Sequence, residues 1–495
     1  MSDFTLNGSA VGALALSCAY LLVHTVGETR KLAHIPSVGF NGPLLSYISA
    51  LQLLWDPPGY LRRAWRTIPP STHFVKVPGF SRWVVVGTRP EHYKEIAGAP
   101  DHQITLRMAV EEFLQARYTM FDSEIGDNGH VAPIREKLNR SLSDLVPEVY
   151  DEAKFVFHDE FPLVDERPFV AFPTIVKIIA RTSNRILVGL PLCRNPEYID
   201  TCINYAVVVF VMSHILCFIP PFLRSFVNWL VSPVPSRVKK MTGFLQPLID
   251  TRRKAVEDEG EGYEQPASWR KSTGKGDRDI VLRTMSVNFG SIHTTSLSFT
   301  HGLFSLLSQP QHIDTIREEV EQCIQDEGWT RAANGQHAVL GQLLEGNAEI
   351  RSAGRPHPSL KVQLVSGQRM VMVDCTLSGV FLPKGTMLGT NAIEAQFDED
   401  VFGENALEFD PYRFKIQLPT STLHTLTFGY GKHACPGRFF AAQEMKLLVA
   451  YFLIHYDLKL ENPDGKRPKN LWLNAFNMPS SNARVLMRKR KGVAL

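Results

Sequence analysis

The alternation of apolar and polar positions along the chain predicts a helix-rich protein. Helical patterning dominates from about residue 133 to 190 and includes the segment IVKIIARTSNRILVGL. Residues 279–310 are long and apolar enough to form a helix through the core, which Pro310 ends. Further helices are predicted at 314–327 and 438–453.

The β component is smaller and scattered. Residues 80–88, FSRWVVVGT, predict a strand, and a helix entered at Pro90 follows it. Short β-like pieces lie at 361–387, 470–477 and 483–490. The polar stretch 255–278 lacks apolar periodicity and is interpreted as a solvated linker. The expected fold class is therefore mainly α with minor β.

An apolar run at the N-terminus changes the expected location of the protein. Residues 9–26 carry no formal charge if His24 is neutral, and Arg30 and Lys31 follow the run. A cleaved signal peptide is the alternative, but it needs a basic segment in front, and Asp3 is the only charge there. We therefore expect residues 1–30 to be an uncleaved membrane anchor and residues 31–495 to face the cytosol.

A second apolar stretch lies at 203–235, where Pro220 and Pro221 interrupt it. We expect a helix pair that lies on or dips into the membrane surface, with a second membrane span as the alternative. Either arrangement predicts contact with membrane lipid and entry of substrate from the bilayer.

Composition and charge exclude several classes of protein. The 495 residues are 44% hydrophobic and 21% charged, as in ordinary globular enzymes. A net charge of +3 is too small for this length to suggest a nucleic-acid partner. The seven cysteines show no CxxC spacing, so neither a disulfide framework nor a zinc site is expected.

One cysteine stands in an unusual setting, the stretch TFGYGKHACPG at 427–437. Gly429, Gly431 and Gly437 permit tight backbone turns and bring the main chain close to a flat partner. Backbone N–H groups around the sulfur of Cys435, and the N-terminus of the helix that follows, favour a thiolate. The alternative is a buried structural cysteine in a tight turn.

The loop resembles the haem-binding loop of the cytochromes P-450, F-x-x-G-x-[RH]-x-C-x-G. The chain has Phe428, Gly431, His433, Cys435 and Gly437 at the fixed positions. The resemblance implies haem b as cofactor, with Cys435 as the axial iron ligand and His433 as a partner of a haem propionate.

The resemblance extends over nearly the whole chain. The hydrophobic N-terminal anchor is typical of the microsomal form of the family, and KIIARTSNRILVGLPLCRNPEY and EEVEQCIQDEGWT most resemble fungal members. FDPYRF at 409–414 is similar to the P-x-R-F segment that precedes the cysteine loop. The segment 364–386 is similar to a β region that implies a propionate contact from Arg369. Arg135 matches a basic residue of the C helix, although the usual nearby Trp is missing. The family's location would be the endoplasmic reticulum membrane.

The long core helix is similar to the family's oxygen-activating helix, [AG]-G-x-[DE]-T-[TS]. GSIHTT at 290–295 aligns with it, with small residues at Gly290 and Ser291 that leave space for dioxygen and water. The resemblance implies that Thr294 relays protons and that His293 takes the place of the acid, so both are candidate catalytic residues. The alternative for Thr294 and Thr295 is a hydrogen bond to the carbonyl one turn earlier.

One departure from the family is serious. The E-x-x-R pair of the K helix, which braces the cysteine loop through the P-x-R-F arginine, is absent. Glu349 precedes Arg351 by two residues, which places their side chains about 200° apart on a helix. If Arg355 is the match, Ser352 stands in the Glu position. Either a divergent protein rebuilds the brace, or segment 340–363 is scrambled in the gene model; its weak helical signal favours the second.

The resemblance implies a monooxygenase that inserts one oxygen atom of O2 into a lipophilic small molecule, with electrons from NADPH through a reductase. Lys432, Arg438 and Lys446 are candidates for a basic docking face for the NADPH-cytochrome P-450 reductase, or ordinary solvated charges. The alternatives are a haem-thiolate isomerase or dehydratase and a haem-poor non-catalytic product.

The predicted substrate pocket is apolar. By resemblance its candidates are Phe289, Gly290, Ile292, Val365 and Phe476, and each of these residues is otherwise explained by core packing. A terpenoid, a fatty acid or an aromatic hydrocarbon would suit such a lining, and a role in secondary metabolism is expected.

Overall fold

The fold is that of a computed structural model of the 495-residue chain. It describes residues 8–69, 71–79, 81–121, 131–162, 166–259, 276–330, 365–391, 421–423, 426–473 and 476–491. The α-helices are α1 (Gly8–Lys31), α2 (Leu45–Trp55), α3 (Pro57–Arg66), α4 (Pro90–Gly98), α5 (Leu106–Leu114), α6 (Ala116–Thr119), α8 (Val131–Pro133), α9 (Leu142–Glu160), α10 (Ala171–Leu187), α11 (Pro196–Cys217), α12 (Pro221–Val231), α13 (Val234–Glu259), α15 (Asp277–Leu307), α16 (Ile313–Glu327) and α21 (Arg438–His455).

Short helical turns and strands complete the described elements. A π-helical turn is η1 (Ile134–Leu138), and 3-10 turns are η2 (Leu192–Arg194), η4 (Pro310–His312) and η5 (Gly431–His433). The strands are β1 (Phe74–Pro78), β2 (Trp83–Gly87), β3 (Ile104–Thr105), β4 (Arg167–Val170), β5 (Val365–Val371), β6 (Cys375–Leu377), β7 (Val380–Leu382), β8 (Met387–Asn391), β9 (Tyr456–Leu460), β10 (Leu471–Leu473), β11 (Phe476–Met478) and β12 (Arg484–Lys489). The predicted class, mainly α with minor β, is confirmed.

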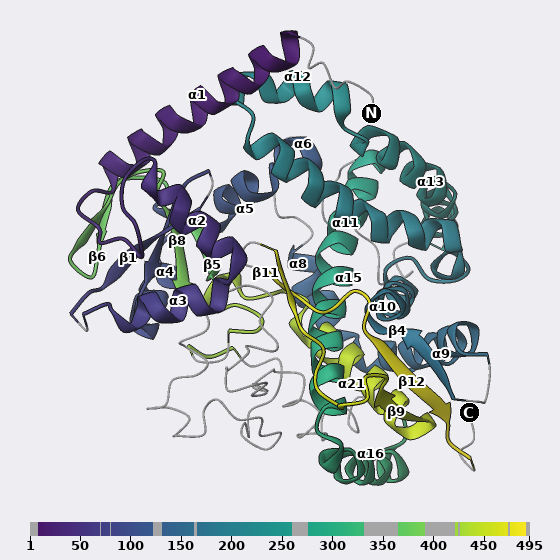
Figure 1. The fold of residues 1–495 in the computed structure, drawn as a ribbon. Helices are drawn as coiled ribbons and strands as arrows, with labels where there is room; N and C mark the ends of the chain where they lie inside the picture. Colours follow the sequence, from purple (N-terminus) through teal and green to yellow (C-terminus); the bar gives the residue numbers. More distant parts are fainter. Residues whose placement is uncertain are drawn as a thin grey trace, which may run out of the picture.

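Helix α15 is the axis of the helical part of the molecule. Its 31 residues run through the middle of the ribbon, with α10, α11, α13 and α21 packed against it (Figure 1). The helix ends at Leu307, just before Pro310, as the sequence predicts. The segment before α15 differs from the prediction. Helix α13 continues to Glu259, so the linker expected at 255–278 begins later.

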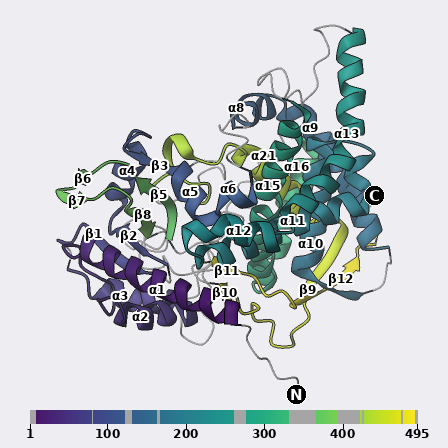
Figure 2. The same cartoon turned by 90° about the horizontal axis from the view of Figure 1, so that it is seen from above.

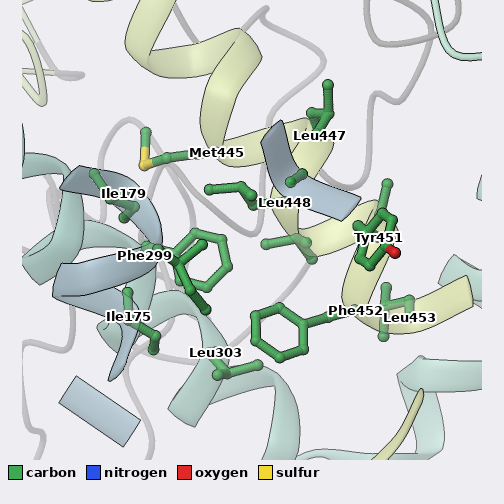
Figure 3. Packing of buried hydrophobic residues seen from close by; sticks show 14 of the residues in the cluster. Ile175, Ile179, Phe299, Leu303, Met445, Leu447, Leu448, Tyr451, Phe452 and Leu453 are labelled. Carbon is green, nitrogen blue, oxygen red and sulfur yellow. The ribbon is translucent and has the colours of Figure 1, made fainter. Parts of the chain in front are cut away.

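The main apolar core lies where α21 crosses α10 and α15. Phe452 and Leu448 of α21 meet Phe299 and Leu303 of α15, with Ile179 of α10 at the other side (Figure 3). These side chains are all almost completely buried. Burial of such a set stabilises each large side chain by roughly 1.5–3 kcal/mol, and it fixes α21 immediately after the cysteine loop.

A five-stranded mixed sheet forms the smaller part of the molecule. Its strand order is β1-β2-β8-β5-β3, and α1–α4 lie on the same side of the molecule as this sheet (Figures 1 and 2). The predicted strand at 80–88 is β2, which pairs antiparallel with β1 and parallel with β8. The pairing of β5 with β8 sets the position of Arg369.

Four of the described strands, β1, β3, β4 and β9, were not predicted. Strand β4 pairs with β12, and β12 also pairs with β9, although β4 and β12 are about 300 residues apart in the chain. β9 follows α21 directly. Pairing over such separations leaves no local pattern in the sequence, because each short strand is stabilised by its distant neighbours.

The apolar stretch 203–235 is a helix pair, as predicted. Helix α11 ends at Cys217 and α12 begins at Pro221, so the two prolines separate them. Within the described residues, α11 is the helix that is long and apolar enough to cross a membrane, and half of its apolar window is buried inside the protein. That burial makes α11 a core helix by its contacts, which it shares with α15 and α13.

The N-terminal helix α1 is continuous through the predicted anchor boundary at residue 30. Its last turns are attached to the body of the protein. The Thr25 hydroxyl lies 2.9 Å from that of Tyr47, and the Trp83 indole donates to Thr29 at 3.1 Å. The prediction of a membrane anchor at 1–30, separate from a domain at 31–495, stays a prediction.

Candidate active site

The cysteine loop is closed by its own backbone. The Cys435 N–H donates to the Phe428 carbonyl at 2.8 Å, and Ala434 N–H donates to the Gly431 carbonyl at 3.0 Å. Gly429 and Gly431 have φ values of 74° and 71°, in the left-handed region that favours glycine. The sequence expectation that glycines permit this turn therefore has a structural basis at these two positions.

The surroundings of the Cys435 sulfur act in opposite directions on its charge. Burial raises the pKa of the Cys435 thiol, whereas a hydrogen bond from the Gly437 backbone and the charge of Arg438 lower it. Helix α21 begins directly after, at Arg438, with Gly437 as its N-cap residue. The loop thus surrounds the sulfur with groups that stabilise a thiolate, while burial favours a partner of positive charge.

His433, the predicted propionate partner, is tied to Asp101. Its Nε2 lies 2.8 Å from Asp101 Oδ1, and Lys432 Nζ lies 3.0 Å from the same oxygen. These two contacts hold the pKa of the Asp101 carboxyl below its ordinary value. Because Nε2 is engaged by Asp101, a propionate contact from His433 needs Nδ1.

Arg369 is a buried guanidinium on β5. In the described part of the chain its hydrogen bond is to the Gln368 carbonyl at 2.8 Å, and no carboxylate lies within ion-pair distance. Burial lowers the pKa of Arg369, and Tyr93 and Asp101 counteract this through their charges. A buried cation without a carboxylate costs free energy unless an anion binds it.

Tyr93 is a site residue that sequence reasoning missed. It lies on α4, and its ring is 5.9 Å from that of Tyr430 in the cysteine loop. Burial raises the pKa of its hydroxyl, and the nearby charge of Arg369 lowers it, so the group is a neutral phenol. Its hydroxyl is buried, with no hydrogen-bond partner among the residues described. An unsatisfied buried hydroxyl is uncommon. The sequence predicts a helix entered at Pro90, but it gives no sign of what Tyr93 on that helix faces.

Arg135 comes from the π-helical turn η1. The turn lies against the cysteine loop, because Arg135 Nη2 donates to the Lys432 carbonyl at 3.2 Å. A β-carbon on Gly437 would lie 3.9 Å from Ile134. Arg135 is otherwise exposed. The structure therefore brings Arg135 to the same loop as His433 and Cys435, and its role toward haem stays a prediction.

The oxygen-side candidates lie on α15. Gly290 is exposed, and a β-carbon there would meet nothing within 4 Å. Thr294 is also exposed, although Thr295 is buried. The Thr294 hydroxyl donates to the Gly290 carbonyl at 2.6 Å, which is the contact of the alternative interpretation. The hydroxyl oxygen still has lone pairs that can accept a hydrogen bond. The hydrogen bond to Gly290 is therefore compatible with a role of Thr294 in proton transfer.

His293, the second catalytic candidate, is directed at α11. Its Nε2 lies 2.9 Å from the Ile203 carbonyl, and burial lowers the pKa of the imidazole. A neutral ring that donates from Nε2 holds α15 against α11. A proton-relay role for His293 would have to use Nδ1, and it stays a prediction.

The pocket candidates separate into two groups. The ring of Phe289 lies 5.5 Å from Phe210 of α11, and the ring of Phe476 lies 6.1 Å from Phe210 and 5.6 Å from Phe113 of α5. We call Phe113, Phe210, Phe289 and Phe476 the aromatic cluster. Phe113 and Phe210 were not predicted, because aromatic residues on helices are ordinary core residues by pattern.

Two pocket candidates fare differently. Ile292 is 0% exposed and belongs to an apolar cluster with Tyr205 and Val209 of α11, which is the core packing of the alternative interpretation; its place in a pocket stays a prediction. Val365 begins β5, but its side chain lies outside the described set. The segments 340–363 and 409–414, with the E-x-x-R and P-x-R-F predictions, also lie outside the described residues.

Comparison with known proteins decides the family. The cytochrome P450 family profile matches residues 85–487. Cytochrome P450 monooxygenase 71 of Postia placenta is 34% identical, over 94% of this chain and 95% of the relative. The chain belongs to the cytochrome P450 family.

Other relatives of this P450 are also fungal. Cytochrome P450 monooxygenase 151 of Postia placenta is 31% identical over 94% of this chain and 95% of the relative. Cytochrome P450 monooxygenase CYP512U6 of Ganoderma lucidum is 29% identical over 93% of each chain. The protein is therefore an oxidoreductase of the P450 monooxygenase type.

The residues present fit haem, which the P450 family implies. Burial raises the pKa of the Cys435 thiol on balance, and the Gly437 backbone N–H and the charge of Arg438 lower it, so a bound metal cation would be needed to hold the sulfur as a thiolate. The buried Arg369 guanidinium and the buried Tyr93 hydroxyl are donors that suit the carboxylates of the haem edge. Both lie near the cysteine loop, Tyr93 through its contact with Tyr430.

One predicted docking residue is wrong. Lys446 is 4% exposed and lies within α21, so its ammonium is inside the protein and unavailable to a partner protein. Lys432 is exposed and Arg438 is half-buried. The Arg438 Nη1 donates to the Cys435 carbonyl at 3.1 Å, which commits this side chain to the loop as well.

A buried carboxyl group links the helix after the loop to α10. Thr182 Oγ1 and Ser183 Oγ lie 2.7 and 2.9 Å from Glu444 Oε1. Burial raises the pKa of Glu444 to about 7, and the two hydroxyl groups partly counteract it. The carboxyl is therefore protonated in the folded P450 at mildly acidic pH.

We expect the stability of the protein to fall as the pH rises through this range. A carboxyl with a raised folded-state pKa is stabilising below its ordinary pKa, and that contribution is lost up to about pH 7. The loss is on the order of 3 kcal/mol, and Glu444→Gln removes the dependence. Denaturation midpoints at about pH 5 and about pH 8 measure it. Glu461→Gln, at an exposed pair with Arg484, is the control and should keep the wild-type dependence of stability on pH. If Glu444→Gln also keeps that dependence, Glu444 is not its source.

Proposed function

We propose that the protein is a membrane-anchored haem-thiolate monooxygenase. It inserts one oxygen atom of O2 into a lipophilic small molecule of secondary metabolism, with electrons from NADPH through the NADPH-cytochrome P450 reductase. The observation that carries the proposal is the cysteine loop. Its closure by Phe428 and the hydrogen bond from Gly437 present one sulfur, Cys435, as an iron ligand.

The chain's own groups divide the work. Haem, when bound, supplies the redox chemistry of dioxygen. Cys435 would hold the iron, while Arg369, Tyr93 and Arg135 would orient the propionates by charge and hydrogen bonds. Gly290 is exposed and has no side chain, so it would leave room for dioxygen. The Thr294 hydroxyl, which donates to the Gly290 carbonyl, would give its proton to the oxygen side and take another from solvent, to which the side chain is exposed.

Exposed apolar side chains support membrane contact. Trp229 of α12 is 78% exposed, and its neighbours Phe222 and Phe226 are also exposed. Trp55 at the end of α2 is 92% exposed. Helices α1, α2 and α12 lie along the same side of the ribbon (Figure 1). Large aromatic residues of this kind suit a lipid interface. We therefore propose an anchor at 1–30, a catalytic domain at 31–495 and a location in the endoplasmic reticulum membrane.

A basic face beside the cysteine loop supports docking of the reductase. Lys432, Arg135 and Lys137 are exposed, and Arg135 bonds to the backbone of Lys432. Positive charges clustered in this way accelerate association with an acidic partner. Lys446 is not part of this face.

Two other functions remain as outcomes of the test. A haem-thiolate isomerase or dehydratase would need no reductase, but the retained Thr294 and the small residue at Gly290 favour oxygen chemistry. A haem-poor product would follow if segment 340–363 fails to brace the loop. Re-sequencing the transcript across 340–363 separates a divergent chain from a faulty gene model.

The test is expression of the full chain with haem supplementation. We expect the protein in the microsomal membrane fraction, a red-shifted Soret band in the reduced carbon-monoxide difference spectrum, and NADPH consumption that needs added reductase. The band establishes thiolate ligation. Turnover without reductase would support the isomerase, and a folded protein without bound haem would support the haem-poor product.

A further inference from the structure

A buried polar network lies at the far end of α15. His301 is 0% exposed, and Arg467 Nη2 lies 2.7 Å from its Nδ1. The same guanidinium contacts the hydroxyl of Ser305 at 3.3 Å and Asn470 Oδ1 at 2.7 Å. On its other side, His301 Nε2 lies 3.2 Å from the Asn477 carbonyl. Buried networks of this kind rigidify the elements they join.

The chemistry of the partners fixes the state of the imidazole. Arginine has donors and no acceptor, so His301 Nδ1 must accept from Arg467. The ring proton of a neutral imidazole is then on Nε2, which donates to the Asn477 carbonyl. Burial and the charge of Arg467 also hold the pKa of His301 well below its ordinary value. The histidine is therefore a neutral link between α15 and the backbone of residue 477.

That link reaches the hairpin β10–β11. Asn477 lies in β11 and pairs with Trp472 of β10. The residue before it is Phe476, whose ring packs on Phe113 and Phe210 in the aromatic cluster. The aromatic cluster also includes Phe289, on the same helix as His301 and Thr294. Moving the hairpin therefore moves one wall of the aromatic cluster.

Helix geometry relates the link to the oxygen side. His301 is seven residues after Thr294, so the two lie on nearly the same face of α15, about 10 Å apart along the axis. The link is thus attached to the same rigid helix that positions the Thr294 hydroxyl. Helix α15 therefore positions both the hairpin and the oxygen-side residues.

We propose that His301, held in its donating tautomer by Arg467, is a positioning residue that sets the place of the β10–β11 hairpin. Phe476 is thereby fixed over the substrate site, and its position determines how well bulky aromatic ligands bind there. This inference rests on the proposed function, since it assigns the aromatic cluster to the substrate side of the haem.

Three variants distinguish the two hydrogen bonds of His301, the one that Nε2 donates to the Asn477 carbonyl and the one that Nδ1 accepts from Arg467. His301→Gln reaches as far as Nε2 and keeps a donor for the Asn477 carbonyl. His301→Asn keeps an acceptor at the position of Nδ1 but falls short of residue 477. His301→Leu loses both. The proposal predicts that the Gln variant behaves like the wild type and that the Asn variant behaves like the Leu variant.

Two measurements on the haem-loaded full chain report the outcome. Clotrimazole, a bulky triaryl imidazole, and imidazole itself both ligate the iron and shift the Soret band, but only clotrimazole reaches the aromatic cluster. We expect His301→Asn and His301→Leu to bind clotrimazole roughly fivefold to tenfold more weakly, the effect of one lost buried hydrogen bond, with imidazole affinity unchanged. Hydrogen exchange of the backbone amides of 471–478 should accelerate in the same two variants.

The opposite pattern overturns the proposal. If His301→Asn matches the wild type while His301→Gln and His301→Leu are impaired, the histidine serves only as an acceptor for Arg467. Equal clotrimazole affinity in all variants also overturns it. If His301→Leu fails to fold, the Gln and Asn pair decides. A failure of the proposed function is separate, because it removes the thiolate band from the wild type.

Discussion

Cys435→Ala is expected to abolish the red-shifted carbon-monoxide band and all NADPH-driven turnover. The sulfur of Cys435 is the proposed iron ligand, and alanine offers no ligand in its place. The fold should survive, because Cys435 is only half-buried and its backbone hydrogen bond to Phe428 does not need the side chain. Difference spectroscopy and turnover with added reductase measure the effect, and circular dichroism checks the fold.

A matched control tests whether the effect belongs to this cysteine. Cys323 on α16 is also half-buried, and Cys323→Ser should retain the full spectrum. Cys435→Ser, which has a hydroxyl of similar size, should lose the thiolate band as Cys435→Ala does. Persistence of that band in either Cys435 variant would show that another group ligates the iron.

Glu152→Leu is expected to cause the largest loss of stability outside the apolar core. Glu152 on α9 is 0% exposed and accepts hydrogen bonds from Arg181 at 2.6 Å and from Arg194 at 2.7 Å. Removal of the carboxylate takes the buried partner away from both guanidinium groups and leaves each with an exposed carboxylate, Asp159 for Arg181 and Asp151 for Arg194. The expected cost is about 3 kcal/mol, at the lower end for a broken buried pair because both arginines retain some exposure. The denaturation midpoint of the variant measures it.

An exposed pair of similar length supplies the comparison. Glu166 lies 2.8 Å from Lys459, with both side chains largely in solvent. Glu166→Gln should change stability by less than about 1 kcal/mol, because solvent screens the pair. If Glu152→Leu and Glu166→Gln lose equal stability, the prediction that burial of Glu152 makes its ion pairs more stabilising is wrong.

Most of the helical architecture could be predicted from the sequence. The core helix at 279–310, the helix pair broken at Pro220 and the strand at 80–88 correspond to α15, α11 with α12, and β2. Each has a strong local signal, either an apolar period or a proline that ends it. Strand β4 had no such signal, because its partner β12 lies at the other end of the chain.

The site shows the same division. Cys435, His433 and Arg135 carry a motif, and the structure brings all three to one loop. Tyr93 was missed, because its relation to Tyr430 and to the charge of Arg369 depends on tertiary packing. Lys446 was misjudged for a related reason. Spacing along a helix gives the face of a residue but does not say what covers that face.

The aromatic cluster is assembled from four segments that are far apart in the chain, α5, α11, α15 and β11, whereas the cysteine loop is one continuous stretch. If the aromatic cluster lines the substrate site, as proposed, substitutions in any of those four segments should alter ligand preference without changing the sequence of the cysteine loop. Ligand preference could then change by substitution in α5, α11, α15 or β11. We therefore expect ligand preference to change more readily during evolution than the reaction itself.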